Sequence, residues 1–169
     1  MNIIAFNQNA QRGAEATLTV VLRLLVEAGI TNRTGGFLCV GRTGDSGFSY
    51  PLHRKIGEVP NEEKSSRCEQ LSKEKVDRLR RSRSDVLSWQ SRCDERGEFQ
   101  GGVRSESDGG DYWYAGFSGL PAEADECFCL IFLIRMRMLT FEAAVERAKI
   151  SNNTTFFRAT VADLLPLTA

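Results

Sequence analysis

The chain has 169 residues, of which 41% are hydrophobic and 26% are charged, and its formal net charge is zero. These values are typical of a folded protein with a full hydrophobic core, and we expect one domain over residues 1–169. Zero net charge provides no general attraction to nucleic acid or to a membrane surface. The single histidine, His53, excludes most catalytic and metal sites that need several imidazoles.

The cysteines and the lack of a long apolar segment predict a cytoplasmic protein with reduced thiols. An odd number of widely spaced cysteines, five in this chain, is not the pattern of a disulfide framework. The first residues lack the basic and apolar regions of a signal peptide. The longest apolar run, residues 127–134, is much shorter than the roughly 18 residues of a membrane span. We therefore expect neither a membrane nor a nucleic-acid partner.

Hydrophobic periodicity predicts a helix and then a hairpin at the start of the chain. The helix covers residues 14–28 and ends at Gly29, which is placed as a C-cap glycine. A continuous apolar run within residues 36–42 predicts a central strand that is buried on both faces. Residues 48–52 predict the second arm of the hairpin, and Pro51 places that arm at an edge of the sheet.

A charged helix is predicted over residues 61–83, with Asn61 as its N-cap and a continuation or restart through residues 86–89. Its last turns carry four arginines within residues 78–83, a cluster that could contact phosphate, nucleic acid or a partner protein. Because carboxylates interleave with the arginines, we interpret the cluster as a solvated helix face. A regulatory protein that docks a partner through this helix stays open as an alternative.

The central stretch predicts a second hairpin that leads into a buried helix. Residues 99–104 and 112–117 read as strands, joined by a turn at residues 108–111. Pro121 suits the first position of the following helix, which is predicted to extend to Met138. Acidic residues in its first turns are favourable at the positive end of the helix dipole. Residues 127–134 are apolar on every face, as in a helix that is buried all round, here in part by another subunit. We therefore expect a homo-oligomer.

The last part of the chain predicts a short helix after Thr140 that stops at residues 151–153, and a docked apolar segment over residues 156–165. The order of these elements predicts an α+β fold, with a single antiparallel sheet built from two hairpins and flanked by helices. A profilin-like or GAF-like arrangement fits this order.

Several residues are candidates for chemistry. His53 lacks further ligands at metal spacing, and we interpret it as a surface residue. Cys127 and Cys129 point about 200° apart on a helix, which predicts two buried thiols and no metal clip. Cys93 lies beside arginines that could lower its pKa. An enzyme that uses Cys93, or the neighbouring carboxylates Asp125 and Glu126 with arginines, is a second alternative.

One resemblance covers most of the chain in topology and about a dozen residues in motif. A Gly101-Gly102 strand, a strand that ends in Ser118-Gly119, and a helix start with Asp125-Glu126 resemble the GlcG/HbpS haem-utilisation family, which includes the C-terminal domain of PduO-type proteins. The resemblance implies a profilin-like fold and a non-catalytic module that binds a small molecule or forms oligomers. Haem is the cofactor that it suggests.

The resemblance and the order of the elements together predict a ligand pocket. It would lie between the sheet and the helix that starts at Asn61. The predicted ligand-binding residues are Gly101, Gly102, Tyr112, Ser118, Gly119, Asp125 and Glu126. No catalytic residue and no metal ligand is predicted.

Overall fold

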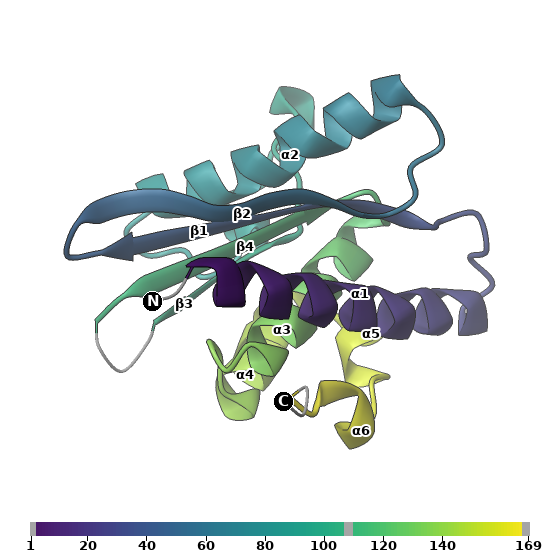
Figure 1. Ribbon diagram of the computed structural model, residues 1–169. Helices are drawn as coiled ribbons and strands as arrows, with labels where there is room; N and C mark the ends of the chain where they lie inside the picture. The colour runs from purple at the N-terminus through teal and green to yellow at the C-terminus, as the bar shows by residue number, and fades with distance from the viewer. Residues whose placement is uncertain (1–2, 107–109, 167–169) are drawn as a thin grey trace.

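The computed structural model describes residues 3–106 and 110–166 of the chain. It contains one antiparallel sheet in the order β2-β1-β4-β3, made of β1 (Gly35–Gly44), β2 (Gly47–Gly57), β3 (Gly102–Glu106) and β4 (Tyr112–Ser118). Helix α2 (Glu62–Arg81) covers one face of the sheet, and α1 (Ile3–Glu27) and α3 (Ala122–Arg135) cover the other (Figure 1). The predicted α+β fold with a single antiparallel sheet flanked by helices is confirmed.

The position of β1 inside the sheet agrees with its continuous apolar sequence. Cys39 packs with residues of α2, while Val40 belongs to the core on the opposite face, and both are fully buried. Strand β2 is at the sheet edge, as Pro51 predicted. It is longer than predicted, because the buried side chains of Leu52 and Ile56 continue its pairing with β1 as far as Gly57.

Helix α1 starts at Ile3, whereas the sequence predicted a start at Ala14. Phe6 and Ala10 extend its buried face toward the N-terminus at helical spacing. The predicted C-cap is confirmed, because Gly29 has a φ of 83° and the amide of Ile30 donates to the carbonyl of Leu25 at 2.9 Å.

Helix α2 begins as predicted, with the side chain of Asn61 accepting a hydrogen bond from the amide of Lys64. The predicted continuation through residues 86–89 is wrong: two short 3-10 turns follow instead, Ser88–Ser91 and Asp94–Arg96. The cause is local, because the side chain of Gln90 accepts the amides of Val86 and Leu87 and so replaces helical bonding.

Strand β3 starts at Gly102 and not at Phe99, as the sequence had suggested. The carbonyl of Phe99 accepts from the side chains of Arg78 and Ser88, so it is turned away from a sheet partner. Gly101, with a φ of 117°, then redirects the chain into the strand. Part of the predicted turn, Asp108 and Gly109, lies outside the described residues.

Helix α3 is buried from Ala124 to Ile134 within one chain. Besides β4 and α1, it contacts α4 (Phe141–Ser151), α5 (Thr154–Phe157) and α6 (Val161–Leu164). It ends at Arg135, before the predicted Met138, because Arg137 adopts a φ of 58° and the amide of Met138 donates to the carbonyl of Leu133. The apolar surface that led us to expect another subunit is therefore covered by the chain itself.

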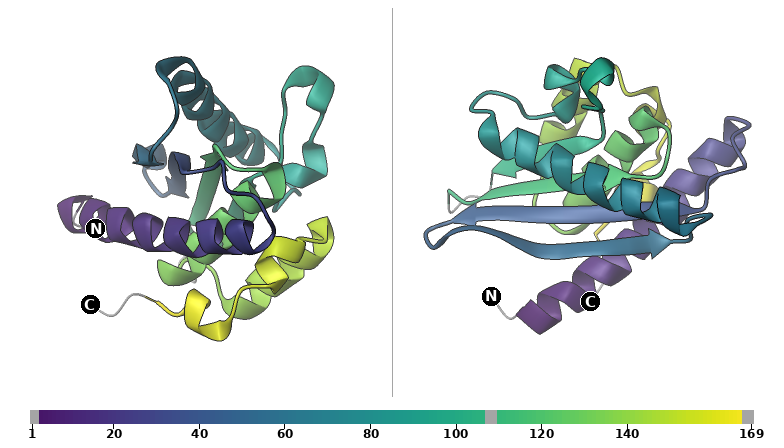
Figure 2. Two further views of the ribbon diagram at one scale, coloured as in Figure 1. Left: turned by 90° about the vertical axis from the view of Figure 1, so that its right-hand side faces the viewer. Right: turned by 90° about the horizontal axis from the view of Figure 1, so that it is seen from above.

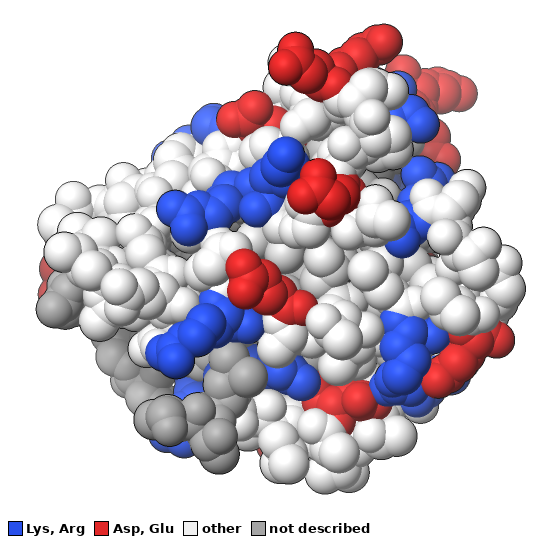
Figure 3. All heavy atoms as spheres, turned by 45° about the vertical axis from the view of Figure 1, so that its right-hand side comes forward, with Lys and Arg blue, Asp and Glu red and all other residues white. Residues whose placement is uncertain are grey.

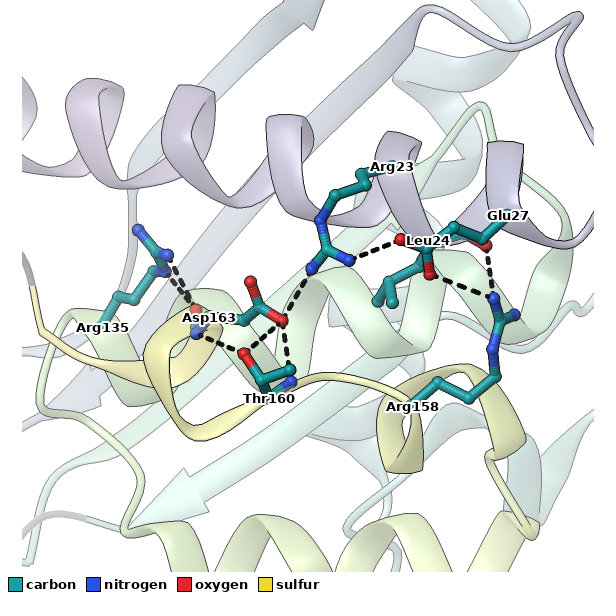
Figure 4. A network of polar contacts seen from close by, with 7 residues as sticks. All are labelled: Arg23, Leu24, Glu27, Arg135, Arg158, Thr160 and Asp163. Atoms are coloured by element: carbon teal, nitrogen blue, oxygen red, sulfur yellow. Dashed lines mark hydrogen bonds and ion pairs between the residues drawn. The ribbon is translucent and has the colours of Figure 1, made fainter.

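The C-terminal segment forms two short helical turns, α5 and α6 (Figure 2). Polar contacts attach them to α1 and α3 (Figure 4). Arg23 forms an ion pair with the carboxylate of Asp163 at 2.7 Å, and Arg135 donates to its carbonyl at the same distance. Arg158 donates to the carbonyl of Leu24 at 3.0 Å. No helix in the described part of the chain has the length and apolar composition to cross a membrane.

Candidate functional site

A buried ion pair connects the two layers of helices at one end of the sheet. The ammonium of Lys75, on α2, lies 3.0 Å from a carboxylate oxygen of Asp125, on α3. It also donates to the carbonyl of Phe117, near the end of β4, at 2.6 Å. The Lys75 side chain is 1% exposed and that of Asp125 is 5% exposed. The lysine therefore joins three elements without meeting solvent.

The Gly101-Gly102 pair makes room for this lysine. A Cβ atom at Gly101 would lie 2.6 Å from the Cβ of Asp125 and 2.7 Å from the Nζ of Lys75. A Cβ atom at Gly102 would lie 3.1 Å from the Cβ of Lys75. Because β3 begins only after Gly101, the long side chain passes the end of that strand to reach α3. The two glycines thus form a passage for the lysine and are not among the lining residues of the cavity described below.

Asp125 also fixes the turn between β4 and α3. Its second carboxylate oxygen accepts the amide of Leu120 at 2.9 Å. The turn is tight, because Gly119 has a φ of 145° and a Cβ there would lie 2.4 Å from the carbonyl of Gly35. Burial raises the pKa of Asp125 to about 6, although the charge of Lys75 acts in the opposite direction.

Glu126 is directed to a different environment. Its carboxylate accepts hydrogen bonds from Gln100 at 3.0 Å, from Asn153 at 3.0 Å and from the hydroxyl of Ser151. The side chain is fully buried, and this burial raises its pKa. Three neutral donors, from the end of α4, the residue Asn153 after it and the segment before β3, thus hold this carboxylate, and Glu126 is not part of the lining of the cavity described next.

A cavity of about 400 Å³ opens beside the buried ion pair. It lies where β1 starts, β2 ends and α2 begins, and the turn after β4 forms one wall. Its lining includes Ser118, Gly119 and Leu120 from that turn, and Cys68 and Leu71 from α2. The predicted position between the sheet and α2, near Ser118 and Gly119, thus coincides with a cavity.

The lining carries more positive than negative charge. Arg33 comes from the loop before β1, whereas Lys64 and Arg67 come from the first turns of α2, and Glu58 is the one carboxylate of the lining. Among the described residues, the side chains of Arg33, Lys64 and Arg67 form no ion pair or hydrogen bond. The sequence analysis did not identify these cations as lining residues, although residues 64, 67, 68 and 71 share one face of a helix.

The thiol of Cys68 is partly buried in this lining. Burial raises its pKa, which a hydrogen bond with Ser118 and the charge of Lys75 and Arg33 only partly oppose. A thiol held in its protonated form is a poor nucleophile. Cys68 therefore suits a lining residue better than a catalytic one.

Other candidates lie elsewhere. Tyr112 is at the opposite end of β4 from Ser118, about 20 Å away at the rise of a strand, and its ring contacts Arg104. His53 lies within β2, where its ring nitrogen is 3.2 Å from the carbonyl of Glu69.

Cys127 is a buried thiol with a raised pKa, as is Cys129.

Cys93 is partly buried beside a 3-10 turn, and its amide donates to the carbonyl of Glu98. The described residues contain no group of three or more His, Cys, Asp or Glu side chains that could hold a metal ion.

The arginines at the end of α2 have separate partners. Arg78 is buried, where it forms an ion pair with Glu74 at 2.9 Å and donates to the carbonyl of Ser88. Arg80 stacks on the ring of Phe48 at 4.3 Å. The cluster is therefore partly structural and does not present four free guanidinium groups on one surface.

No protein-family model, curated protein or solved structure matches the chain. The resemblance to the haem-utilisation family therefore stays a prediction. The structure brings Gly101, Gly102, Ser118, Gly119, Asp125 and Glu126 to one end of the sheet, while Tyr112 lies away from them.

Proposed function

We propose that this chain is a non-catalytic module that binds a small molecule in the cavity between α2 and the end of β4. The supporting observation is the cavity itself, whose walls are fixed by buried contacts. Asp125 holds the turn that carries Ser118, and Lys75 connects the same carboxylate to α2. A site whose walls are ordered before the ligand arrives loses less free energy on binding.

The same geometry favours binding over catalysis. The buried groups Lys75, Asp125 and Glu126 are engaged with one another or with neutral donors. Cys68 is present in the lining, but its pKa is raised and His53 lies outside the lining. The cavity thus lacks an activated nucleophile with a neighbouring base.

The lining does not fit haem well. Haem needs an axial ligand and a mainly apolar pocket. Cys68 is the one cysteine or histidine of the lining, and burial disfavours its thiolate form. Charged side chains surround the rest of the opening. We therefore keep the ligand-binding role that the resemblance implies and propose a ligand other than haem.

We also propose a cytoplasmic location, because all five cysteines are free thiols. A homo-oligomer is not needed for this function, since the cavity is lined by one chain.

Filling the cavity tests the proposed function. In the Leu71→Trp variant, an indole ring replaces a partly buried side chain of the lining. We would mix wild type and variant with the low-molecular-mass fraction of a cell extract and record native mass spectra. A saturable adduct with wild type that is lost in Leu71→Trp is expected. An adduct that both proteins bind equally, or none at all, would contradict the proposal. Circular dichroism would be recorded to check that the variant is folded, and Leu165→Trp, at an exposed site outside the lining, is the matched control.

A further inference from the structure

We infer that the ligand of this cavity is an anion with an apolar body, and that Arg33, Lys64 and Arg67 bind its charged group. This inference rests on the proposed function and specifies the chemical class of the ligand.

The charge of the lining is the first argument. Three cations and one carboxylate, Glu58, surround the cavity of a chain that has no net charge. Figure 3 shows that basic and acidic side chains are interspersed over the face it presents. An excess of one sign around the cavity therefore differs from the equal numbers of basic and acidic residues in the whole chain, and such an excess raises the local concentration of the opposite charge.

The second argument is that these cations have no partner. On the same helix, Lys73 pairs with Asp77 at 2.8 Å and Arg78 pairs with Glu74. Arg33, Lys64 and Arg67 form no such pair within the described residues. Guanidinium groups bind carboxylates and phosphates through two parallel hydrogen bonds, so two free arginines at one opening match an anionic group.

The spacing along α2 directs these groups toward one ligand. Lys64, Arg67, Cys68 and Leu71 occupy positions i, i+3, i+4 and i+7, which lie on one face of a helix. Arg33 approaches from the loop before β1, near enough for its charge to lower the pKa of Cys68. The anionic group would thus be held between two segments that are far apart in the sequence.

The rest of the lining supplies an apolar surface. Val59 and Pro60 come from the connection between β2 and α2, Leu71 comes from α2, and the buried Leu120 comes from the turn after β4. A ligand with a charged group at the opening and an apolar body inside would contact both kinds of surface. Carboxylates and phosphate esters share this chemistry.

Two fluorescent probes that differ in charge test the inference. 8-Anilinonaphthalene-1-sulfonate is anionic, whereas N-phenyl-1-naphthylamine has the same ring system without the sulfonate. We expect wild type to bind the sulfonate at least about tenfold more tightly, since a charge-assisted hydrogen bond contributes a factor of about ten. In Arg33→Gln/Arg67→Gln, sulfonate binding should fall by at least about tenfold, and binding of the neutral probe should stay within about twofold. Binding of the sulfonate should also weaken as salt is added.

The matched control is Arg81→Gln/Arg83→Gln, which removes two exposed arginines near the other end of α2. It should leave both affinities unchanged. Equal losses in the two double variants, or equal binding of the two probes to wild type, would overturn the inference. Leu71→Trp should abolish the binding of both probes, which separates the cavity from apolar surface elsewhere.

Competition identifies the anionic group. 4-Nitrobenzoate or 4-nitrophenyl phosphate should displace the sulfonate probe, and the stronger competitor distinguishes a carboxylate from a phosphate. Displacement by neither, or equal displacement by neutral 4-nitrobenzamide, would contradict an anion site. If both probes bind in the cavity of wild type with equal affinity, and Arg33→Gln/Arg67→Gln changes neither affinity, the inference is refuted while the proposed function stays intact.

Discussion

Asp125 and Glu126 are neighbours in the sequence and both are buried, yet they serve different parts of the molecule. Asp125 accepts hydrogen bonds from Lys75 and from the amide of Leu120, and so holds a wall of the cavity. Glu126 accepts from Gln100, Ser151 and Asn153, and so holds the end of α4 against α3. One carboxylate faces a buried cation, and the other faces only neutral donors.

The comparison shows why adjacency in a helix does not make a paired-carboxylate site. Successive residues of an α-helix point about 100° apart, so Asp125 and Glu126 face different neighbours. The two environments also determine how the removal of each carboxylate affects the stability of the fold. Loss of Asp125 leaves a buried charge without its partner, whereas loss of the Glu126 charge leaves only neutral groups.

The largest expected effect is that of Asp125→Ala. It leaves the ammonium of Lys75 buried without a carboxylate and the amide of Leu120 without an acceptor. We expect a loss of about 3–5 kcal/mol in the free energy of unfolding, measured by urea denaturation at neutral pH.

The matched control for Asp125→Ala is Lys75→Met/Asp125→Asn, which removes both charges and keeps an acceptor for Leu120. It should be less destabilising than Asp125→Ala. If the double variant is the less stable of the two, the loss in Asp125→Ala does not come mainly from the unpaired ammonium of Lys75 and the unpaired amide of Leu120.

Gly101→Ala is expected to destabilise by about 3 kcal/mol, because it combines an unfavourable φ with a steric conflict against Lys75 and Asp125. Gly97→Ala is the control, since Gly97 has a φ of 70° and open space around its Cα. That variant should lose only about 1 kcal/mol. Similar losses in thermal or urea denaturation would show that the passage for Lys75 is not tight.

The pH dependence should separate Asp125 from the other carboxylates. Because burial raises its pKa to about 6, the folded protein binds a proton that the unfolded chain has already lost. The stabilising contribution of this proton is complete below about pH 4 and is lost as the pH rises through about 6.

We therefore expect the stability of wild type relative to Asp125→Asn to increase by about 2 kcal/mol between pH 7 and pH 4. Other carboxylates, such as Asp163, whose pKa is lowered, change stability with pH in the opposite direction. Because wild type and Asp125→Asn share these groups, their contributions cancel when the two stabilities are subtracted. A relative stability that decreases on acidification would mean that Lys75 outweighs burial.

Glu126→Gln should have the smallest effect, about 1 kcal/mol, because the amide keeps one acceptor for the three donors and no buried cation loses a partner. Urea denaturation at neutral pH measures this loss. A loss as large as that of Asp125→Ala would break the distinction between the two carboxylates.

The sequence predicted those parts of the fold that depend on local signals. Gly29 ends α1, Asn61 caps α2, Pro51 marks the edge strand and Thr140 caps α4, as expected. Each of these signals acts within one turn of its own residue. The predicted starts of α1 and β3 were wrong. Phe6 is buried by residues far away in the sequence, such as Trp113, with which its ring stacks. The carbonyl of Phe99 accepts a hydrogen bond from the side chain of Arg78 on α2.

The site was only partly predictable for the same reason. Ser118, Gly119 and Asp125 were identified by motif, whereas Lys75 lay within the predicted helix of residues 61–83 and was assigned no role. Its partner is 50 residues away in the sequence, and the passage past Gly101 exists only when the sheet is assembled. Tyr112 was also predicted to bind the ligand, but the length of β4 separates it from Ser118.

The most direct test of the cavity as a ligand site is the alkylation rate of Cys68. In Cys93→Ser the other three cysteines are buried, so Cys68 is the one thiol that a small alkylating reagent reaches. At a concentration of 8-anilinonaphthalene-1-sulfonate ten times its dissociation constant, we expect alkylation to slow by about tenfold, and to be unaffected by the probe when Leu71→Trp is added. An alkylation rate that the bound probe leaves unchanged would contradict the assignment of the cavity as the binding site.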